Sequence, residues 1–334
     1  MATRWFVPLA GVLLAAWGAI AAEGKKGPRP TPDLPEPPQP RSRAEVEAVL
    51  ARAPRPPAGK ALRALHLVLL ADVKDHGPEA HDYPLWQKRW ALLLGGGSAS
   101  TETQANLFGP PSPQDADQLA AGAPGVRVTT AWQWPTAEQL RSADLLVMFC
   151  YRSGGKPRCW SDQRVKELET FLARGGGFVP IHSPTYAARD LTAPEAGKEV
   201  RLTGVAFDTS ILVRHGPISL KIAAPVHPIC LGLPATIELF DEPYWPPVGE
   251  VSQIEVLATS QETVAKDSSQ TAPQPMFWTY RYGKGRVFAC VPGHFTWTFD
   301  DPYFRMLLLR GMAWAAGESP YRFDPLVLRG ARVR

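Results

Sequence analysis

Residues 161–182, SDQRVKELETFLARGGGFVPIH, contain the pattern that decides the fold. Ser161 is a typical helix N-cap, and apolar residues then recur at helical spacing as far as Leu172. The glycines at 175–177 end this helix, and residues 178–182 predict a strand. A helix that leads directly into a strand is half of a β-α-β unit, so this stretch predicts a parallel sheet covered by helices.

The same alternation extends to both sides of this stretch. Residues 62–71 (LRALHLVLLA) and 144–150 (DLLVMFC) are nearly continuous apolar runs, which is typical of strands that are buried on both faces. In the second half strands dominate, and Gly-Lys-Gly at 283–285 predicts a hairpin turn. We expect further strands at 126–131, 218–222, 237–240, 254–258, 276–282 and 286–291, and helices at 42–53, 83–94, 137–141 and 302–316.

The N-terminal sixty residues differ from the rest in composition. Residues 1–21 have a basic start, an apolar run and an Ala-x-Ala site, which predicts a cleaved export signal and a periplasmic or secreted protein. An uncleaved membrane anchor is the alternative. Residues 22–60 predict a Pro-rich linker, in which Ser42 and Glu45 form a capping box for the helix at 42–53. We expect the folded domain to occupy residues 61–334.

The charge distribution argues against nucleic-acid binding. The net charge is +4, and residues 1–60 hold nine Lys and Arg but only five Asp and Glu. The body of the chain is therefore neutral, whereas a protein that binds phosphates concentrates basic residues on its folded domain.

Candidate catalytic residues follow the predicted strands. Ligands of open α/β sheets bind beyond the carboxyl ends of the strands, and His76, His182 and His294 each come just after one. Glu242 follows the strand at 237–240, where a carboxylate can orient a histidine. We therefore expect His182 and His294 to act as an acid/base pair, with Glu242 orienting one of them. The other candidates, His215 and His227, are typical of turns.

The loop after the first strand is a candidate for substrate or metal binding. It contains Asp75, His76, His81 and Asp82, and imidazole with carboxylate suits Zn²⁺ or a similar ion. Asp82 is equally suited to cap the helix that begins at the next residue. We therefore expect His76 and Asp82 to contact substrate. Any metal should bind weakly, through His76 and His81, with His182 or His294 as an additional ligand from the cleft.

Aromatic residues near these loops are candidates for sugar binding, because aromatic faces pack on the C–H faces of sugars. Tyr83, Trp245 and Trp297 are the candidates, the two tryptophans because they lie in predicted turns. We expect Trp86 and Trp278 to belong to the core.

Several common catalytic motifs are absent from the sequence. It contains no G-x-S-x-G nucleophile elbow, no G-x-G-x-x-G dinucleotide loop and no G-x-x-x-x-G-K-[ST] phosphate loop. Serine hydrolases, nucleotide-dependent oxidoreductases and P-loop ATPases are therefore disfavoured.

Several spaced motifs together resemble the ThuA-like (trehalose utilisation) family. The longest is PMFWTYRYGKGRVFACVPGHFTWTFDDPYFRMLLLRGMAWAAG at 275–317. The GGGFVPIH element at 175–182, the His-Pro-Ile turn at 227–229 and Asp241-Glu242 followed by Tyr244 are similar to the family as well. The loop KDHGPEAHDY at 74–83 resembles a secreted subgroup common in planctomycete-type bacteria.

The resemblance implies a flavodoxin-like, class I glutamine amidotransferase-like fold, a three-layer α/β sandwich with a mostly parallel sheet. Amidotransferases carry a nucleophilic cysteine after the central strand, but here the matching turn is His182-Ser183-Pro184. We therefore expect no glutaminase activity. The family's link to carbohydrate catabolism implies a hydrolase, lyase or isomerase that acts on a sugar or keto-sugar. A non-catalytic sugar- or partner-binding module and a metal-dependent hydrolase are the alternatives.

Two of the four cysteines lie close together in the sequence. In an exported protein Cys150 and Cys159 can form a disulfide across a short loop, and buried free thiols are the alternative. Mass spectrometry of the alkylated protein, with and without reductant, distinguishes the two.

If residues 1–21 are an export signal, the mature chain lacks them. N-terminal sequencing of the protein recovered from the cell envelope or medium should then begin near Ala22. A chain that begins at Met1 and stays in the cytoplasm would contradict this prediction.

Overall fold

A mixed sheet forms the centre of the computed structural model, which describes residues 35–54, 61–97, 104–111, 121–151, 160–186, 193–208 and 210–334. The strands are β1 (Leu65–Ala71), β2 (Val126–Trp132), β3 (Leu145–Met148), β4 (Gly177–Pro180), β6 (Gly216–Ile222), β7 (Thr236–Asp241), β9 (Glu255–Thr263), β10 (Thr271–Tyr282) and β11 (Gly285–Cys290). They lie in the order β2-β1-β3-β4-β11-β10-β9-β6-β7, and β5 (Leu212–Val213) pairs with β8 (Tyr244–Trp245) in a small second sheet.

The first five strands of that order are parallel, as the sequence predicts. β1 pairs with β2 and β3, and β4 pairs with β3 and β11, in each case parallel. Every residue of β1, β3 and β4 is buried, because helices cover both faces of this half. The predicted α/β sandwich with a mostly parallel core is confirmed.

The other strands run antiparallel and alternate in direction. β10 is antiparallel to β11, β9 to β10, β6 to β9 and β7 to β6. In β6 buried and exposed residues alternate strictly, which is typical of a strand with one face in solvent. The alternation has a geometric consequence: β7 runs in the same direction as β1, β4 and β11. The carboxyl ends of these four strands therefore lie at the same edge of the sheet.

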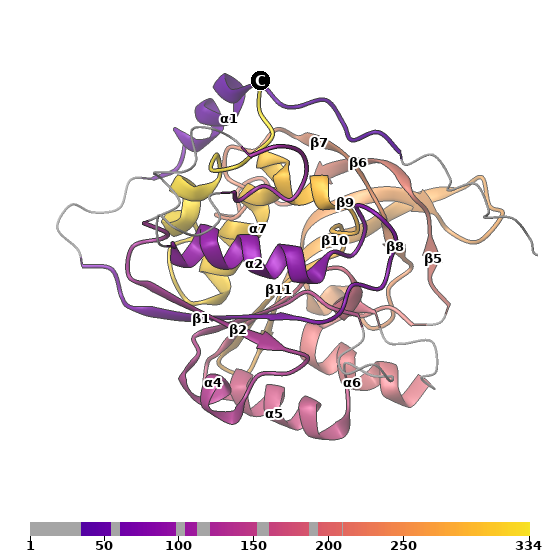
Figure 1. The fold of residues 1–334 in the computed structure, drawn as a ribbon. Helices are drawn as coiled ribbons and strands as arrows, with labels where there is room; N and C mark the ends of the chain where they lie inside the picture. Colours follow the sequence, from indigo (N-terminus) through magenta and orange to yellow (C-terminus); the bar gives the residue numbers. More distant parts are fainter. Residues whose placement is uncertain are drawn as a thin grey trace, which may run out of the picture. The chain divides into compact units, whose positions relative to one another are not determined.

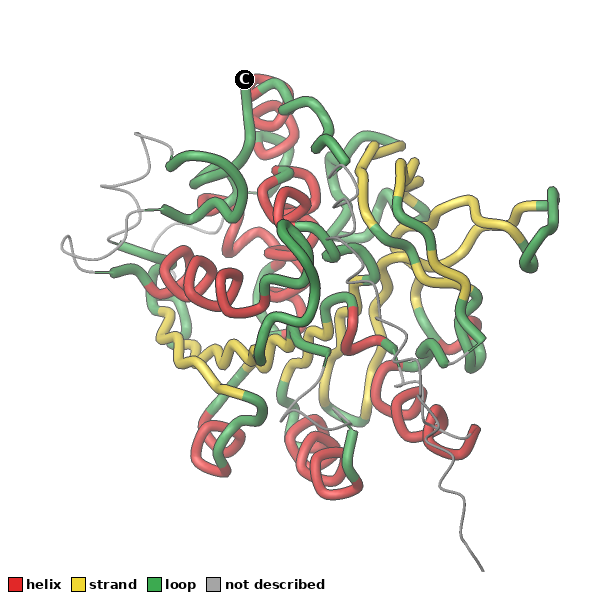
Figure 2. Tube along the Cα trace, turned by 45° about the vertical axis from the view of Figure 1, so that its right-hand side comes forward, coloured by secondary structure: helices red, strands yellow, loops and turns green. Residues whose placement is uncertain are grey.

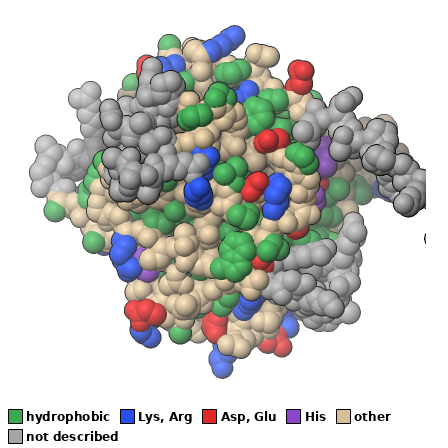
Figure 3. All heavy atoms as spheres, viewed as in Figure 1, with side chains coloured by type: hydrophobic (Ala, Val, Ile, Leu, Met, Phe, Trp, Pro, Cys, Tyr) green, Lys and Arg blue, Asp and Glu red, His purple; other side chains and the backbone are tan. Residues whose placement is uncertain are grey.

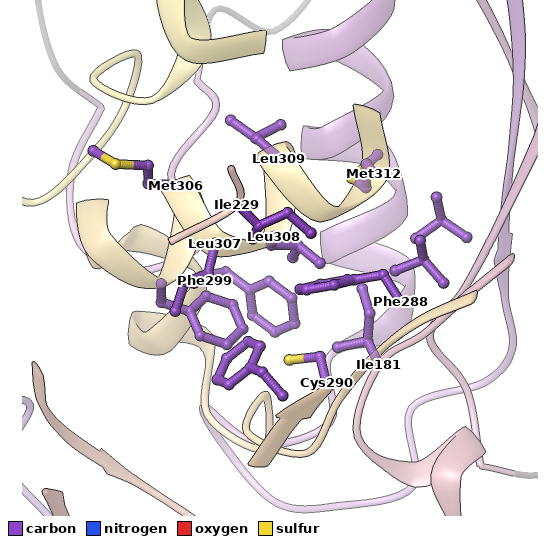
Figure 4. Packing of buried hydrophobic residues seen from close by; sticks show 14 of the residues in the cluster. Ile181, Ile229, Phe288, Cys290, Phe299, Met306, Leu307, Leu308, Leu309 and Met312 are labelled. Atoms are coloured by element: carbon purple, nitrogen blue, oxygen red, sulfur yellow. The ribbon is translucent and has the colours of Figure 1, made fainter. Parts of the chain in front are cut away.

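Helices cover the sheet on both faces (Figures 1 and 2). One layer contains α2 (Tyr83–Gly95) and α7 (Pro302–Ala315), and the other contains α4 (Ala137–Ser142), α5 (Asp162–Ala173) and α6 (Ala193–Thr203). α7 is apolar around most of its circumference and deeply buried, as expected. It approaches the sheet closely because Gly311 faces the ring of Phe288, where a Cβ would lie 2.3 Å from Cδ1. Figure 4 shows the packing of α7 against β11.

The folded unit begins earlier than residue 61. The compact unit comprises Pro37–Arg334, because α1 (Arg43–Leu50) packs into the core through Val46 and Val49. Arg41 forms an ion pair with Asp301 at the start of α7. The end of the linker is thus part of the domain. The predicted capping box at the start of α1 is wrong, since the Ser42 side chain caps no backbone N–H.

Two predictions fall largely outside the described residues. The structure describes neither the leader at 1–21 nor Cys159. Cys150 is buried two residues after the end of β3. The export signal and the disulfide therefore stay predictions. None of the helices in the described ranges combines the length and apolarity that a membrane span requires.

The surface agrees with the neutral composition of the body. In Figure 3 basic and acidic side chains are interspersed over the visible face, without a continuous basic patch. The prediction that the protein binds no nucleic acid remains to be tested.

A buried ion pair anchors α7 and gives a stability prediction. The guanidinium of Arg310 makes a bidentate pair with Asp324, at 2.9 and 2.8 Å, and Arg310 is fully buried. Arg310→Ala leaves the Asp324 carboxylate without its counter-ion, which should lower the free energy of unfolding by about 3–5 kcal/mol. The exposed Arg141, which pairs with Glu138, is the matched control. Arg141→Ala should cost no more than about 0.5 kcal/mol in the same urea titration. Equal costs for the two variants would contradict this prediction.

Candidate functional site

Three histidines and a glutamate meet at the carboxyl edge of the sheet. They come from four separate segments: the loop after β1, the turn after β4, the end of β7 and the loop after β11. Each contributes one potential ligand atom, and these atoms lie within 4.8 Å of one another. We call this set the His/Glu cluster: His81, His182, Glu242 and His294. All four side chains are almost completely shielded from solvent.

Glu242 is the centre of the cluster. Its Oε2 lies 3.1 Å from Nε2 of His182 and 3.2 Å from Nδ1 of His294. Its other oxygen, Oε1, lies 2.9 Å from Nε2 of His215, which precedes β6. One carboxylate thus contacts three imidazoles, two inside the cluster and one at its rim.

His182 occupies a sharp turn between β4 and the short 3-10 helix that follows. Its φ and ψ are 60° and −112°, a conformation that residues other than glycine rarely adopt. Its Nδ1–H donates to the carbonyl of Val291 at 2.7 Å, so in the neutral ring Nε2 carries the lone pair. That Nε2 lies 3.0 Å from Nε2 of His81 and 2.8 Å from the hydroxyl of Tyr244.

His81 is held from its opposite side. Its Nδ1 lies 2.9 Å from Oδ1 of Asp75 and 2.8 Å from the hydroxyl of Tyr83. A carboxylate only accepts, so Nδ1 of His81 carries the proton and Nε2 is turned into the cluster as an acceptor. The backbone N–H of His81 donates to the carbonyl of His294, which joins the two loops.

Asp241 fixes the loop that carries His294. It is fully buried, and its Oδ1 accepts the backbone N–H groups of Gly293 and His294 at 3.0 and 2.9 Å. The same oxygen accepts the N–H of Glu242, and Oδ2 accepts the hydroxyl of Thr298. Asp241 is therefore a positioning residue that sets Glu242 and His294 relative to each other.

The surroundings shift the pKa values of Glu242 and of the histidines near it in different directions. Burial raises the pKa of Glu242, but the contacting imidazoles of His182 and His215 outweigh burial and hold this pKa well below its usual range. Burial lowers the pKa of His81 to about 3 and also lowers the pKa of His294. The contact with Glu242 raises the pKa of His215. Burial thus favours neutral imidazoles at His81 and His294 beside the Glu242 carboxylate, and the contact with Glu242 favours an imidazolium at His215.

Two partly exposed histidines form the rim of the cluster. The side chains of His76 and His215 are 43% and 52% exposed. The ring of His76 lies 3.8 Å from that of His81, and the ring of His215 lies 4.6 Å from that of His294, between centroids. A ligand that approaches along this side meets imidazoles first and the carboxylate behind them.

The structure brings together the residues expected to act in catalysis. The ring centroids of His182 and His294 are 5.5 Å apart, and Glu242 contacts both. This separation is well below the roughly 12 Å beyond which two bridging waters no longer connect two groups. Their catalytic role stays a prediction, since proximity alone does not test it.

The structure places most of the expected substrate-binding residues away from the exposed rim of the cluster. Trp245 and Trp297 are 5% and 2% exposed, and their indole N–H groups donate to backbone carbonyls, so their faces are unavailable to a sugar. Tyr83 is fully buried and supports His81 instead. Asp82 caps α2 and pairs with Lys74. His76 alone of the expected set lies at the accessible rim.

Sequence analysis did not predict the place of three residues in the site. His215 was expected in a turn, and it does precede β6, but this turn lies at the functional edge because β6 runs opposite to β7. Tyr244 stacks on His182, and Asp241 joins β7 to the loop after β11. The Asp-Glu-x-Tyr motif at 241–244 was the available signal for two of them.

Two groups within the described residues have metal-ligating geometry. One is the His/Glu cluster, and the other comprises Asp75, His76 and His81. The second group is more exposed, and its carboxylate is already committed to the two imidazoles.

Comparisons with known proteins agree with the fold. A family model described as trehalose utilisation, ThuA, matches residues 112–315. A ThuA-like protein from Bacteroides uniformis has 18% identity and a TM-score of 0.53, over 80% of this chain and 99% of that one. A ThuA-like protein from Parabacteroides merdae has 18% identity and a TM-score of 0.49, over 77% and 92%. No curated protein sequence matches.

The role of Asp241 gives a prediction about the stability of the site. Asp241→Ala removes the acceptor of buried N–H groups in two loops and should cost about 2–5 kcal/mol of unfolding free energy. Asp241→Asn keeps an acceptor oxygen and should cost less. Urea unfolding of the two variants measures the difference. If the alanine variant is as stable as the asparagine variant, Asp241 does not hold the loop.

Proposed function

Because this chain belongs to the ThuA (trehalose utilisation) family, we propose that it is a carbohydrate-active enzyme whose reaction takes place at the His/Glu cluster. One observation carries this proposal: four segments that are far apart in the sequence place three imidazoles and a carboxylate within 4.8 Å of one another. A module that only binds sugar has no need for a buried cluster of titratable groups, which is costly to desolvate.

The cluster is suited to proton transfer. A proton that one of the contacting imidazoles accepts produces a cation next to Glu242, which stabilises it. The raised pKa of His215 and the lowered pKa of His294 give an acid and a base against the same carboxylate. Groups whose environments separate their pKa values are the usual arrangement for acid/base catalysis.

A sugar or keto-sugar is the substrate class that this chemistry fits. The hydrogen on a carbon next to a ketone is far more acidic than one next to a hydroxyl, so an imidazole suffices to remove it. Hydrolysis, elimination and isomerisation of such sugars all begin or end with proton transfer. We expect no glutaminase activity, since His182 rather than a cysteine follows β4.

We also propose that the protein is periplasmic or secreted. The support is the leader pattern of residues 1–21 and the prolines that follow it.

Glu242 provides the test of the proposed enzyme. The purified protein should turn over at least one compound in a panel of glycosides and 3-keto-glycosides, detected by mass spectrometry of the products. Glu242→Gln should lower kcat/KM by about 10²–10⁴-fold, because the amide no longer stabilises an imidazolium. The control is Glu255→Gln. Glu255 also faces a histidine, His227, but lies at the opposite edge of the sheet, and its variant should retain full activity.

Binding measurements separate the enzyme from its alternative. If calorimetry detects sugar binding but no compound of the panel is converted, the protein is a sugar-binding module. If Glu242→Gln retains full activity, the reaction takes place elsewhere.

A further inference from the structure

We propose that the His/Glu cluster is a binding site for a divalent transition metal ion, ligated by Nε2 of His81, Nε2 of His182, Oε2 of Glu242 and Nδ1 of His294. The proposal deepens the proposed function and rests on it for the role of the ion in the reaction. The site itself is argued from geometry and is testable without a substrate.

The first argument is that acceptors face acceptors inside the cluster. Asp75 and the carbonyl of Val291 fix the protons of His81 and His182 on their outer nitrogens. In the neutral rings their inner Nε2 atoms both carry lone pairs, yet lie 3.0 Å apart. Oε2 of Glu242, which also only accepts, lies 3.1 Å from Nε2 of His182. Such an arrangement is repulsive unless a positive charge lies between the atoms.

The second argument is that hydrogen bonds do not resolve this repulsion. Tyr244 has a single hydroxyl proton for its contacts with His182 and Glu242, and His215 contacts the outer oxygen of Glu242, not the inner one. His294 is 3% exposed, and its Nδ1 lies 3.2 Å from Oε2 of Glu242 without the alignment of a good hydrogen bond. A proton bridges two of the four inner atoms at most, whereas a dication binds all of them.

The third argument is distance. Donor atoms that each lie about 2.1 Å from one ion are about 3.0–4.2 Å from one another in tetrahedral or octahedral sites. Three separations within the cluster are 3.0, 3.1 and 3.2 Å, and none of the four atoms is more than 4.8 Å from another. A small contraction around an ion would complete the site.

The outer contacts of the ligands complete the pattern. In metal sites a ligating histidine donates its other N–H to a carboxylate or a backbone carbonyl. His81 does so to Asp75 and His182 to Val291. These contacts fix the tautomer that ligation requires.

The donor set selects the class of ion. Three imidazoles and one carboxylate favour Zn²⁺, Mn²⁺ or a similar first-row dication over Mg²⁺ and Ca²⁺, which prefer all-oxygen sites. Such an ion would polarise a sugar carbonyl or hydroxyl at the rim. His182 and His294 would then be ligands, and proton transfer would fall to the exposed His215 and His76.

The experiment measures metal binding directly. Full-length untagged protein is stripped with chelator and dialysed. Zn²⁺ and Mn²⁺ binding is then followed by calorimetry, with elemental analysis of the reloaded protein. We expect about one ion per chain and a higher Tm when the ion is present, since binding stabilises the folded state. His81→Gln and Glu242→Gln should weaken binding by more than the roughly 10–100-fold that loss of an outer contact costs.

A matched control tests the location of the site. His227→Gln removes an imidazole that also faces a carboxylate, Glu255, at the other edge of the sheet, and should bind the ion as the wild type does. Circular dichroism confirms that each variant is folded. The proposal is overturned if the folded wild type binds neither ion at millimolar concentration. It is equally overturned if His81→Gln and Glu242→Gln bind as tightly as the wild type.

The tests of metal binding and of turnover have independent outcomes. One bound ion without turnover of any compound supports the metal site and overturns the proposed enzyme. Full turnover by stripped protein in chelator supports the enzyme and overturns a catalytic role for the ion.

Discussion

The carboxylate of Asp241 is the constraint on which the site depends. β7 is the last strand of the sheet, and three strands separate it from β11 in the sheet order. Nevertheless Asp241 at the end of β7 accepts two backbone N–H groups of the loop that follows β11. The antiparallel half of the sheet must therefore curve back over the end of the parallel half. Without this curvature Glu242 would be far from His182 and His294.

The two halves of the sheet thus have different tasks. The central strands of the parallel half are buried, and its strands β1 and β4 position His81 and His182. The antiparallel half places Glu242 and His215 against them from the other side. A site between two such halves is assembled only when both are folded. The charged groups of the site are consequently buried only when the two halves come together.

The sequence predicts the parallel half well and the curvature not at all. Continuous apolar runs identify β1, β3 and β4 because burial on both faces leaves no room for polar residues. The capped and almost wholly apolar α7 is similarly clear. No local pattern shows how far the antiparallel strands bend. α6 also has no strong signal, since Gly197 and several charged residues interrupt its pattern.

The candidate site is predictable to the same extent. The position of His182, His294 and Glu242 after strands follows from the general rule for α/β sheets. His81 joins these residues and His76 does not, because the loop after β1 turns His81 inward. The direction in which this loop turns is set by tertiary packing and not by a local sequence pattern. The tryptophans show the opposite error: a turn position suggested exposure, but the neighbouring Phe295 and Phe240 bury Trp297.

The contacts between the first and last residues of the folded unit have a consequence for synthesis. Arg41 forms a parallel bridge with Val333, and Pro38 accepts a hydrogen bond from Arg332, 294 residues later. A ribosome releases Arg41 long before these partners exist. Helix α1 therefore cannot complete these contacts until the C-terminal residues have been synthesised. Contacts so distant in sequence slow folding and leave the nascent apolar surface under α1 open to chaperones during that interval.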